Sequence, residues 1–253
     1  MQRFSMFWIG ALALFQLVGC DANQGKTPPA QLKRHFYGTH KLTAKVPDIG
    51  NIKYTIRMPK GYDGKTPVPL VLMLHYGGGA QSESHIGSEM IEALGPGFDE
   101  LNPIIIAPDA LGGSWTSPQN ERAAIWLTES AIQTYNVDQA RVLITGFSMG
   151  GEGTWYIGSR HQDLFTGAIP IAARVAEGPD WAIPLYVIHS ADDQVMSFSA
   201  AKSHTEALKA NGSTVEFVDA AGLTHYDTPA YQTHLPTAAK WMSDQWQQPI
   251  PRR

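Results

Sequence analysis

Short apolar runs alternate with amphipathic segments along most of the chain. Continuous runs rich in Val, Ile and Leu, such as residues 69–74 and 103–107, are typical of strands buried on both faces. Between them, apolar residues three or four positions apart predict helices with one buried face. The expected strands are 51–58, 69–74, 103–107, 142–144, 166–171, 184–188 and 214–218, and the expected helices are 84–94, 120–135, a helix after residue 148, 199–210 and 236–246.

This alternation of strands and helices predicts an α/β protein with a mainly parallel sheet and helices on both faces. A chain of 253 residues provides one sizeable core. The connection between the strands at 166–171 and 184–188 is only 12 residues long, 172–183. That length leaves no room for an inserted lid domain, so we expect an open site.

The N-terminal residues have the pattern of an export signal. Arg3 precedes an apolar run at 6–18, shorter than the roughly 20 residues that span a bilayer. The tetrad LVGC at 17–20 resembles the bacterial lipobox, and Cys20 is the single cysteine of the sequence. We therefore expect a lipoprotein signal peptide at 1–19, a lipid-anchored tether at 20–32 and the folded α/β domain at 33–253. The protein would lie in the bacterial cell envelope, on a periplasmic or outer face. An ordinary signal peptide with a chance cysteine is the alternative.

Composition removes several classes of function. A net charge of −4 with 17% charged residues provides no basic surface for nucleic acid. One cysteine excludes a disulfide framework within a monomer. The sequence holds no HExxH metal motif and no phosphate-binding loop, and residues 151–153 lack the third glycine of a dinucleotide fingerprint. We expect no cofactor and no metal, and no pattern indicates an oligomeric state.

The stretch GFSMG at 146–150 stands where a buried strand changes to a helix. This G-x-S-x-G spacing is typical of a nucleophile elbow, in which a strained turn exposes the serine hydroxyl. The glycines on either side let neighbouring backbone approach without a Cβ clash. Ser148 is therefore the candidate nucleophile, against the alternative of an ordinary turn residue.

A serine hydroxyl needs a base, and that base needs a carboxylate to orient it. Asp192 and Asp193 both follow the strand at 184–188, and His225 follows the strand at 214–218. The order Ser, Asp, His is the one expected for an elbow serine. A surface histidine is the alternative interpretation of His225.

Two further groups of residues stand near expected strand ends. His75 and His189 are interpreted as structural. The glycines at 77–79 follow the strand at 69–74, so the backbone N–H groups of Gly77 and Met149 are candidates for an oxyanion hole. Tyr76 and Trp115 are candidates for the substrate pocket, with plain loop packing as the alternative for Trp115.

Four segments, 58–75, 136–155, 189–193 and 222–225, carry a family resemblance within residues 51–246. The chain resembles α/β-hydrolases of the esterase and predicted-peptidase group related to polyhydroxybutyrate depolymerases and feruloyl esterases. Relatives have H-G-x-x-D at 189–193, which implies Asp193 rather than Asp192. Tyr76 stands where relatives have the first glycine of L-H-G-G-G, so the role of Gly77 requires the loop to keep its path. Ser190 also replaces a glycine.

The expected function is that of a serine hydrolase that cleaves carboxylic esters through Ser148, His225 and Asp193 and an acyl-enzyme. Its partners would be a small-molecule or polymer-borne ester and, through the lipid on Cys20, a membrane. One alternative keeps the triad but makes the protein a peptidase or thioesterase. Another is a non-catalytic, lipid-tethered binding module. An ester panel and labelling by a fluorophosphonate would separate these classes.

Overall fold

The computed structural model describes residues 32–77, 85–176 and 181–248. The expectations for the signal peptide at 1–19, for Cys20 and for all but the last residue of the tether lie outside the described residues.

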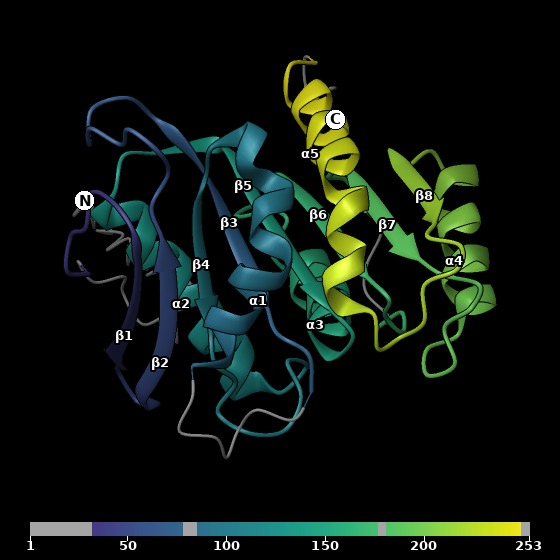
Figure 1. Cartoon of the computed structure of the whole chain (residues 1–253), viewed down its shortest axis with the longest axis horizontal. Helices are drawn as coiled ribbons and strands as arrows, with labels where there is room; N and C mark the ends of the chain where they lie inside the picture. Colours follow the sequence, from purple (N-terminus) through teal and green to yellow (C-terminus); the bar gives the residue numbers. More distant parts are fainter. Residues whose placement is uncertain (1–31, 78–84, 177–180, 249–253) are drawn as a thin grey trace, which may run out of the picture.

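One eight-stranded sheet forms the centre of the described structure, in the order β1-β2-β4-β3-β5-β6-β7-β8 (Figure 1). The strands from β4 to β8 in this order pair in parallel, whereas β1 and β2 pair antiparallel at one edge. The mainly parallel sheet expected from the sequence is confirmed. The strands are β1 Thr39–Val46, β2 Gly50–Arg57, β3 Val68–Leu74, β4 Ile104–Pro108, β5 Val137–Phe147, β6 Gly167–Ile171, β7 Leu185–His189 and β8 Val215–Asp219.

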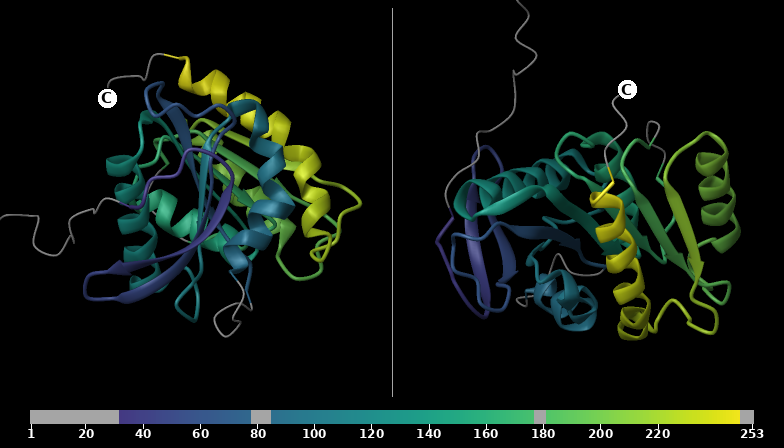
Figure 2. Two further views of the ribbon diagram at one scale, coloured as in Figure 1. Left: turned by 60° about the vertical axis from the view of Figure 1, so that its left-hand side comes forward. Right: turned by 90° about the horizontal axis from the view of Figure 1, so that it is seen from above.

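Helices cover both faces of this sheet. Residues of α1 and α5 belong to the core on one face, and residues of α2 and α3 belong to the core on the other (Figure 2). Helix α4 packs beside β7 and β8. The helices are α1 Ile86–Leu94, α2 Pro118–Thr134, α3 Met149–Arg160, α4 Phe198–Ala210 and α5 Leu235–Trp246, with 3₁₀ helices η1 Gly95–Leu101 and η2 Thr228–His234.

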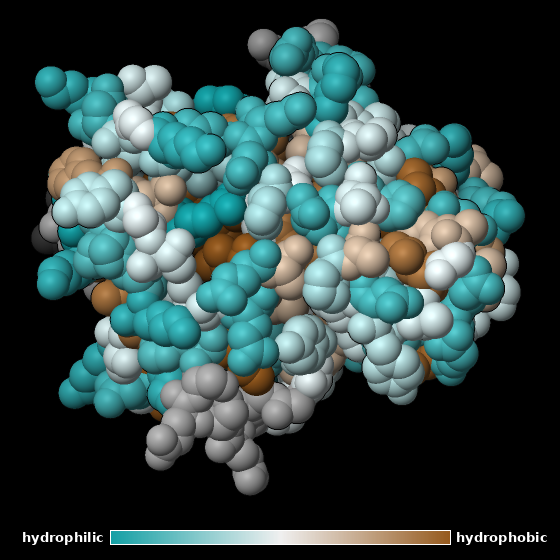
Figure 3. Space-filling model, in the orientation of Figure 1, coloured by the Kyte–Doolittle hydropathy of each residue, from teal (hydrophilic) through white to brown (hydrophobic). Residues whose placement is uncertain are grey.

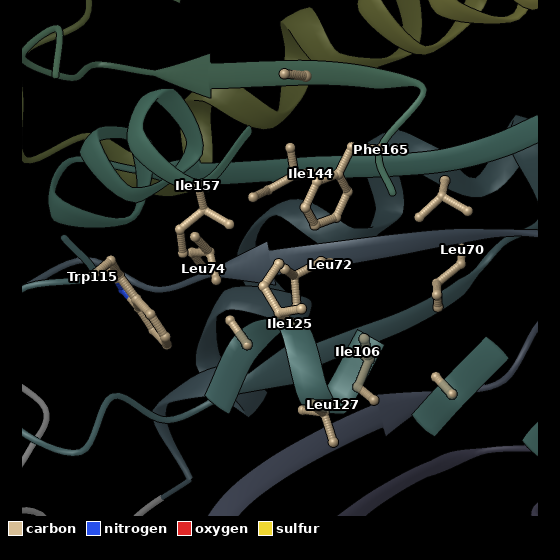
Figure 4. Packing of buried hydrophobic residues seen from close by; sticks show 14 of the residues in the cluster. Leu70, Leu72, Leu74, Ile106, Trp115, Ile125, Leu127, Ile144, Ile157 and Phe165 are labelled. Atoms are coloured by element: carbon tan, nitrogen blue, oxygen red, sulfur yellow. The ribbon is translucent and has the colours of Figure 1, made fainter. Parts of the chain in front are cut away.

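The central strand β3 shows why a strand covered on both faces is apolar throughout. Leu70, Leu72 and Leu74 point into the core beneath α2 and α3, where Figure 4 shows them near Ile144 and other branched side chains. Val71 and Met73 point into the core beneath α1 and α5. Because successive side chains of a strand face opposite sides, a strand covered on both faces must be apolar at every position.

Strand β1 was not among the predicted elements. Its sequence THKLTAKV is mostly exposed or half-buried, and only Ala44 and Val46 are buried. A strand at the edge of a sheet needs little apolar surface, so its sequence carries a weak signal. Helix α1 begins two residues later than expected, and residues 95–101 continue it as a 3₁₀ helix.

The connection from β6 to β7 contains no helix or strand in the part of it that the structure describes, which agrees with the absence of a lid domain. Within the described ranges, no helix is long and apolar enough to cross a membrane. On the described face over α1 and α5, polar residues predominate and apolar ones form small separate areas (Figure 3).

Candidate active site

Ser148 occupies a sharp turn between the end of β5 and the start of α3. Its backbone has φ 55° and ψ −118°, a strained conformation for a residue with a side chain. The Ser148 N–H donates to the carbonyl of Ile171 over 3.0 Å, and its own carbonyl accepts from the N–H of Glu152 over 2.9 Å. These two bonds tie the turn to β6 and to the first turn of α3, so the surrounding structure maintains the strain.

The glycines of the motif are required by close backbone approach. A Cβ on Gly146 would lie 2.4 Å from the carbonyl oxygen of Gly150, and one on Gly150 would lie 2.0 Å from that of Leu74. Both distances are far inside van der Waals contact. The turn is therefore packed directly against the end of β3, which brings the loop after β3 to the serine.

Ser148, His225 and Asp193 lie in a row. His225 Nε2 is 2.8 Å from Ser148 Oγ, and His225 Nδ1 is 2.8 Å from Asp193 Oδ2. Ser148 is 9% exposed and His225 7%, so the row is largely shielded from water. Because Nδ1 faces a carboxylate, it carries the ring hydrogen, and Nε2 is left as the acceptor for the serine proton.

Asp193, rather than Asp192, is the carboxylate that is hydrogen-bonded to His225. Its Oδ1 accepts from the backbone N–H groups of Val195 and Met196, each over 2.8 Å. Burial by itself raises the pKa of Asp193, but the hydrogen bonds from His225, Met196 and Val195 outweigh it, so the pKa is lowered from its ordinary value. Asp192 is exposed and accepts from the N–H of Gly222 over 2.7 Å, which holds the loop that leads to His225.

His75 has the structural role expected from the sequence. Its Nε2 accepts from the N–H of Ala110 over 2.9 Å, so Nδ1 carries the hydrogen and donates to the carbonyl of Tyr76. Burial lowers the pKa of His75, which keeps the ring neutral in this arrangement. The ring therefore joins the loop after β3 to the loop after β4.

His189 lies closer to the row than the sequence indicated. Its Nε2 is 3.3 Å from Asp193 Oδ2, and the side chain is fully buried. The signals in the sequence were the i, i+4 spacing at a strand end and the H-G-x-x-D pattern of relatives at 189–193, and neither reveals which way the two side chains turn.

Gly77 and Met149, the two candidate oxyanion donors, stand beside one another. Met149 is the first residue of α3, so its N–H is among those left free of partners inside the helix. A Cβ on Gly77 would lie 3.9 Å from Met149 Cβ. The positive end of the α3 dipole also points at this place, which favours negative charge there.

Tyr76 lines a cleft. Its hydroxyl donates to Glu89 Oε2 on α1 over 2.9 Å. Burial and this bond raise the pKa of Tyr76, so the hydroxyl stays protonated. The cleft has a volume of about 530 Å³, and its described lining is Tyr76, Glu89, Glu92, Ala93, Tyr226, Thr228 and Pro229. A second hollow, of about 320 Å³, lies between the β1–β2 turn and α2 and includes no residue of the row.

Trp115 is a packing residue in this structure, which is the alternative to its expected place in the substrate pocket. The side chain is 1% exposed, and its indole N–H donates to the carbonyl of His75 over 2.8 Å. Its Cβ packs against Gly153 of α3. A Cβ on Gly153 would lie 2.4 Å from the Cβ of Trp115. A tryptophan in a Gly- and Ser-rich loop indicates burial as readily as a binding surface. Here the indole packs beneath the surface and holds the loop after β3 through its bond to His75.

A metal site is not formed by the described residues, because no group of three or more His, Cys, Asp or Glu side chains is placed to hold an ion. The row of Ser148, His225 and Asp193 is sufficient in kind for acyl transfer: a nucleophile, a base and an orienting carboxylate.

Curated relatives of the chain are fungal esterases. It is 26% identical over 180 residues to a probable feruloyl esterase C of Aspergillus niger. The aligned region covers 67% of this chain and 65% of the relative. It is 27% identical over 165 residues to feruloyl esterase C of Emericella nidulans. That aligned region covers 61% of this chain and 60% of the relative. The chain thus spans less than two thirds of the length of these relatives.

Solved structures agree with the fold. A thermostable esterase superposes with a TM-score of 0.68 at 26% identity, covering 82% of this chain and 63% of that one. A ferulic acid esterase superposes with a TM-score of 0.66 at 17% identity, covering 83% and 99%, a likeness that shows the fold alone. The expected resemblance to α/β-hydrolase esterases is confirmed. The match of residues 61–248 shows that the chain belongs to the dienelactone hydrolase family.

Proposed function

We propose that the protein is a serine hydrolase that cleaves carboxylic esters through an acyl-enzyme. The observation that carries this proposal is the row in which His225 Nε2 stands 2.8 Å from Ser148 Oγ while Asp193 holds Nδ1. The esterase names of the curated relatives support an ester rather than another acyl compound as the substrate.

In this mechanism His225 takes the proton of Ser148 as Oγ attacks the ester carbonyl. The backbone N–H groups of Met149 and Gly77 stabilise the negative oxygen that forms. His225 then gives its proton to the leaving alcohol, and the acyl group stays on Ser148. Water activated by His225 releases the acid and restores the serine. Asp193 keeps the imidazole in the required tautomer and stabilises its protonated form.

The test is replacement of the nucleophile. Ser148→Ala should abolish measurable turnover of p-nitrophenyl acetate, while Ser199→Ala, a change of an exposed serine on α4, should leave it unaltered. Equal turnover by Ser148→Ala and wild type would refute the proposal. A panel with methyl ferulate, a thioester and a peptide amide separates an esterase from a thioesterase or peptidase that uses the same row. Failure of the wild type to react with a fluorophosphonate would favour the non-catalytic binding module.

We also propose, from the sequence pattern at 17–20, that Cys20 is lipidated and anchors the protein in a bacterial cell envelope. Wild type should fractionate with membranes and carry a lipid mass on its N-terminal peptide, and Cys20→Ala should be recovered without that mass. An unmodified wild-type Cys20 would contradict the proposal.

A further inference from the structure

His189 ends strand β7 and lies behind the row of catalytic side chains. Its imidazole Nε2 is 3.3 Å from Asp193 Oδ2, the same oxygen that accepts from His225 Nδ1. The fully buried ring has the carboxylate of Asp193 and the backbone of Met196 as polar neighbours, and it forms a hydrogen bond of ordinary geometry with neither. The edge-on ring of Phe198 packs against it with centroids 5.9 Å apart. A buried polar ring without ordinary hydrogen bonds lowers the stability of the fold, so the presence of a histidine at this position requires an explanation.

The charge state of His189 follows from its surroundings. Burial lowers the pKa of His189, and the neighbouring carboxylate of Asp193 and the backbone of Met196 offset this only in part, so the ring is neutral at pH 7. A neutral imidazole has one N–H and one lone pair. The full negative charge of a carboxylate 3.3 Å away repels a lone pair more strongly than the neutral backbone of Met196 does, so the hydrogen belongs on Nε2. One N–H is thus directed at Asp193 Oδ2.

We propose that His189 is a positioning residue that holds the Asp193 carboxylate in the orientation that His225 needs. Asp193 Oδ1 is fixed by two backbone N–H groups, whereas Oδ2 is bonded by the imidazole of His225, whose charge changes during the reaction. The Nε2–H of His189 approaches Oδ2 from the side of β7 and α4. It restrains rotation of the carboxylate and excludes water from that oxygen while His225 gains and loses its proton.

This inference rests on the proposed function, and a set of three substitutions tests it. In His189→Gln the side-chain amide nitrogen lies as many bonds from Cβ as Nε2 does, so the donor toward Oδ2 is kept. In His189→Asn the amide nitrogen has the shorter reach of Nδ1. In His189→Phe the ring volume and the contact with Phe198 are kept, but no donor remains.

The steady-state kcat and KM for p-nitrophenyl acetate, and the rate of labelling by a fluorophosphonate, are measured for all three and for wild type. We expect kcat and the labelling rate of the Phe and Asn variants to fall about tenfold, the lower end for loss of a hydrogen bond to a charged group, with KM unchanged. His189→Gln should recover most of that loss. A residue that only fills space would give the opposite order, with Phe the best replacement.

Several results would overturn the inference. They are equal kcat in wild type and His189→Phe, a better enzyme with Phe than with Gln, and equal losses in all three. Thermal midpoints of all variants are compared first, and if the Phe variant fails to fold, the difference between Gln and Asn decides. Failure of the proposed function would give a different result: the wild type would itself be inactive, and Ser148→Ala would be indistinguishable from it.

Discussion

Replacement of Asp193 by asparagine tests the proposed mechanism most directly, because the structure dictates how the amide must sit. The N–H groups of Val195 and Met196 both donate to Oδ1. An asparagine must place its oxygen there, so its NH₂ group takes the place of Oδ2 and faces His225 Nδ1. His225 must then present a lone pair at Nδ1 and carry its hydrogen on Nε2. In that tautomer it cannot accept the serine proton.

The size of the effect follows from this tautomer change. In a serine protease triad the same substitution lowers kcat by about 10⁴-fold with the geometry kept, and we expect a loss of that order here. The assay is kcat for p-nitrophenyl acetate under saturating substrate, on a variant whose thermal midpoint has been measured. The matched control is Asp192→Asn, since Asp192 is exposed and its Oδ2 accepts from a loop N–H. Its kcat should stay within a few fold of wild type. A kcat for Asp193→Asn within tenfold of wild type would refute the assigned role of the carboxylate.

Three further outcomes are expected. Gly150→Ala should destabilise the protein by about 3 kcal/mol or prevent folding, because its Cβ would lie 2.0 Å from a carbonyl oxygen on β3; Gly158→Ala, whose nearest contact is 3.0 Å, should cost much less in urea unfolding. Tyr226→Ala should raise KM for aryl esters with a smaller change in kcat, because this exposed ring lines the cleft beside His225; an unchanged KM would remove the cleft from the substrate path. Because the folded-state pKa of Asp193 is lowered, its ionised form stabilises the fold above its ordinary pKa near 3.9, and this contribution disappears as the pH falls through the folded-state pKa. Asp193→Asn should therefore lose less thermal stability between pH 5 and pH 3 than wild type, and equal losses would contradict the pKa shift.

The sequence by itself determined the elements that apolar periodicity marks. Buried strands such as β3 and β4 are apolar at every position, and the residues on either side of Ser148 show the change from strand to helix. The order of serine, acid and histidine along the chain was also readable, because each follows a strand. The edge strand β1 was not, since its alternating polar sequence buries little.

The tertiary structure alone decided which side chains meet. Apolar patterning reports burial, but not the direction in which a residue after a strand turns. Asp192 and Asp193 are adjacent and chemically identical, and they differ because one is fixed by backbone N–H groups beneath His225 while the other points to the loop at Gly222. The burial of Trp115 depends likewise on packing against a glycine of α3 that is distant in sequence. The approach of His189 to Asp193 depends on how the turn after β7 folds back. His225 reaches Ser148 across 77 residues because the sheet places β5, β6, β7 and β8 side by side, an order that no local pattern encodes.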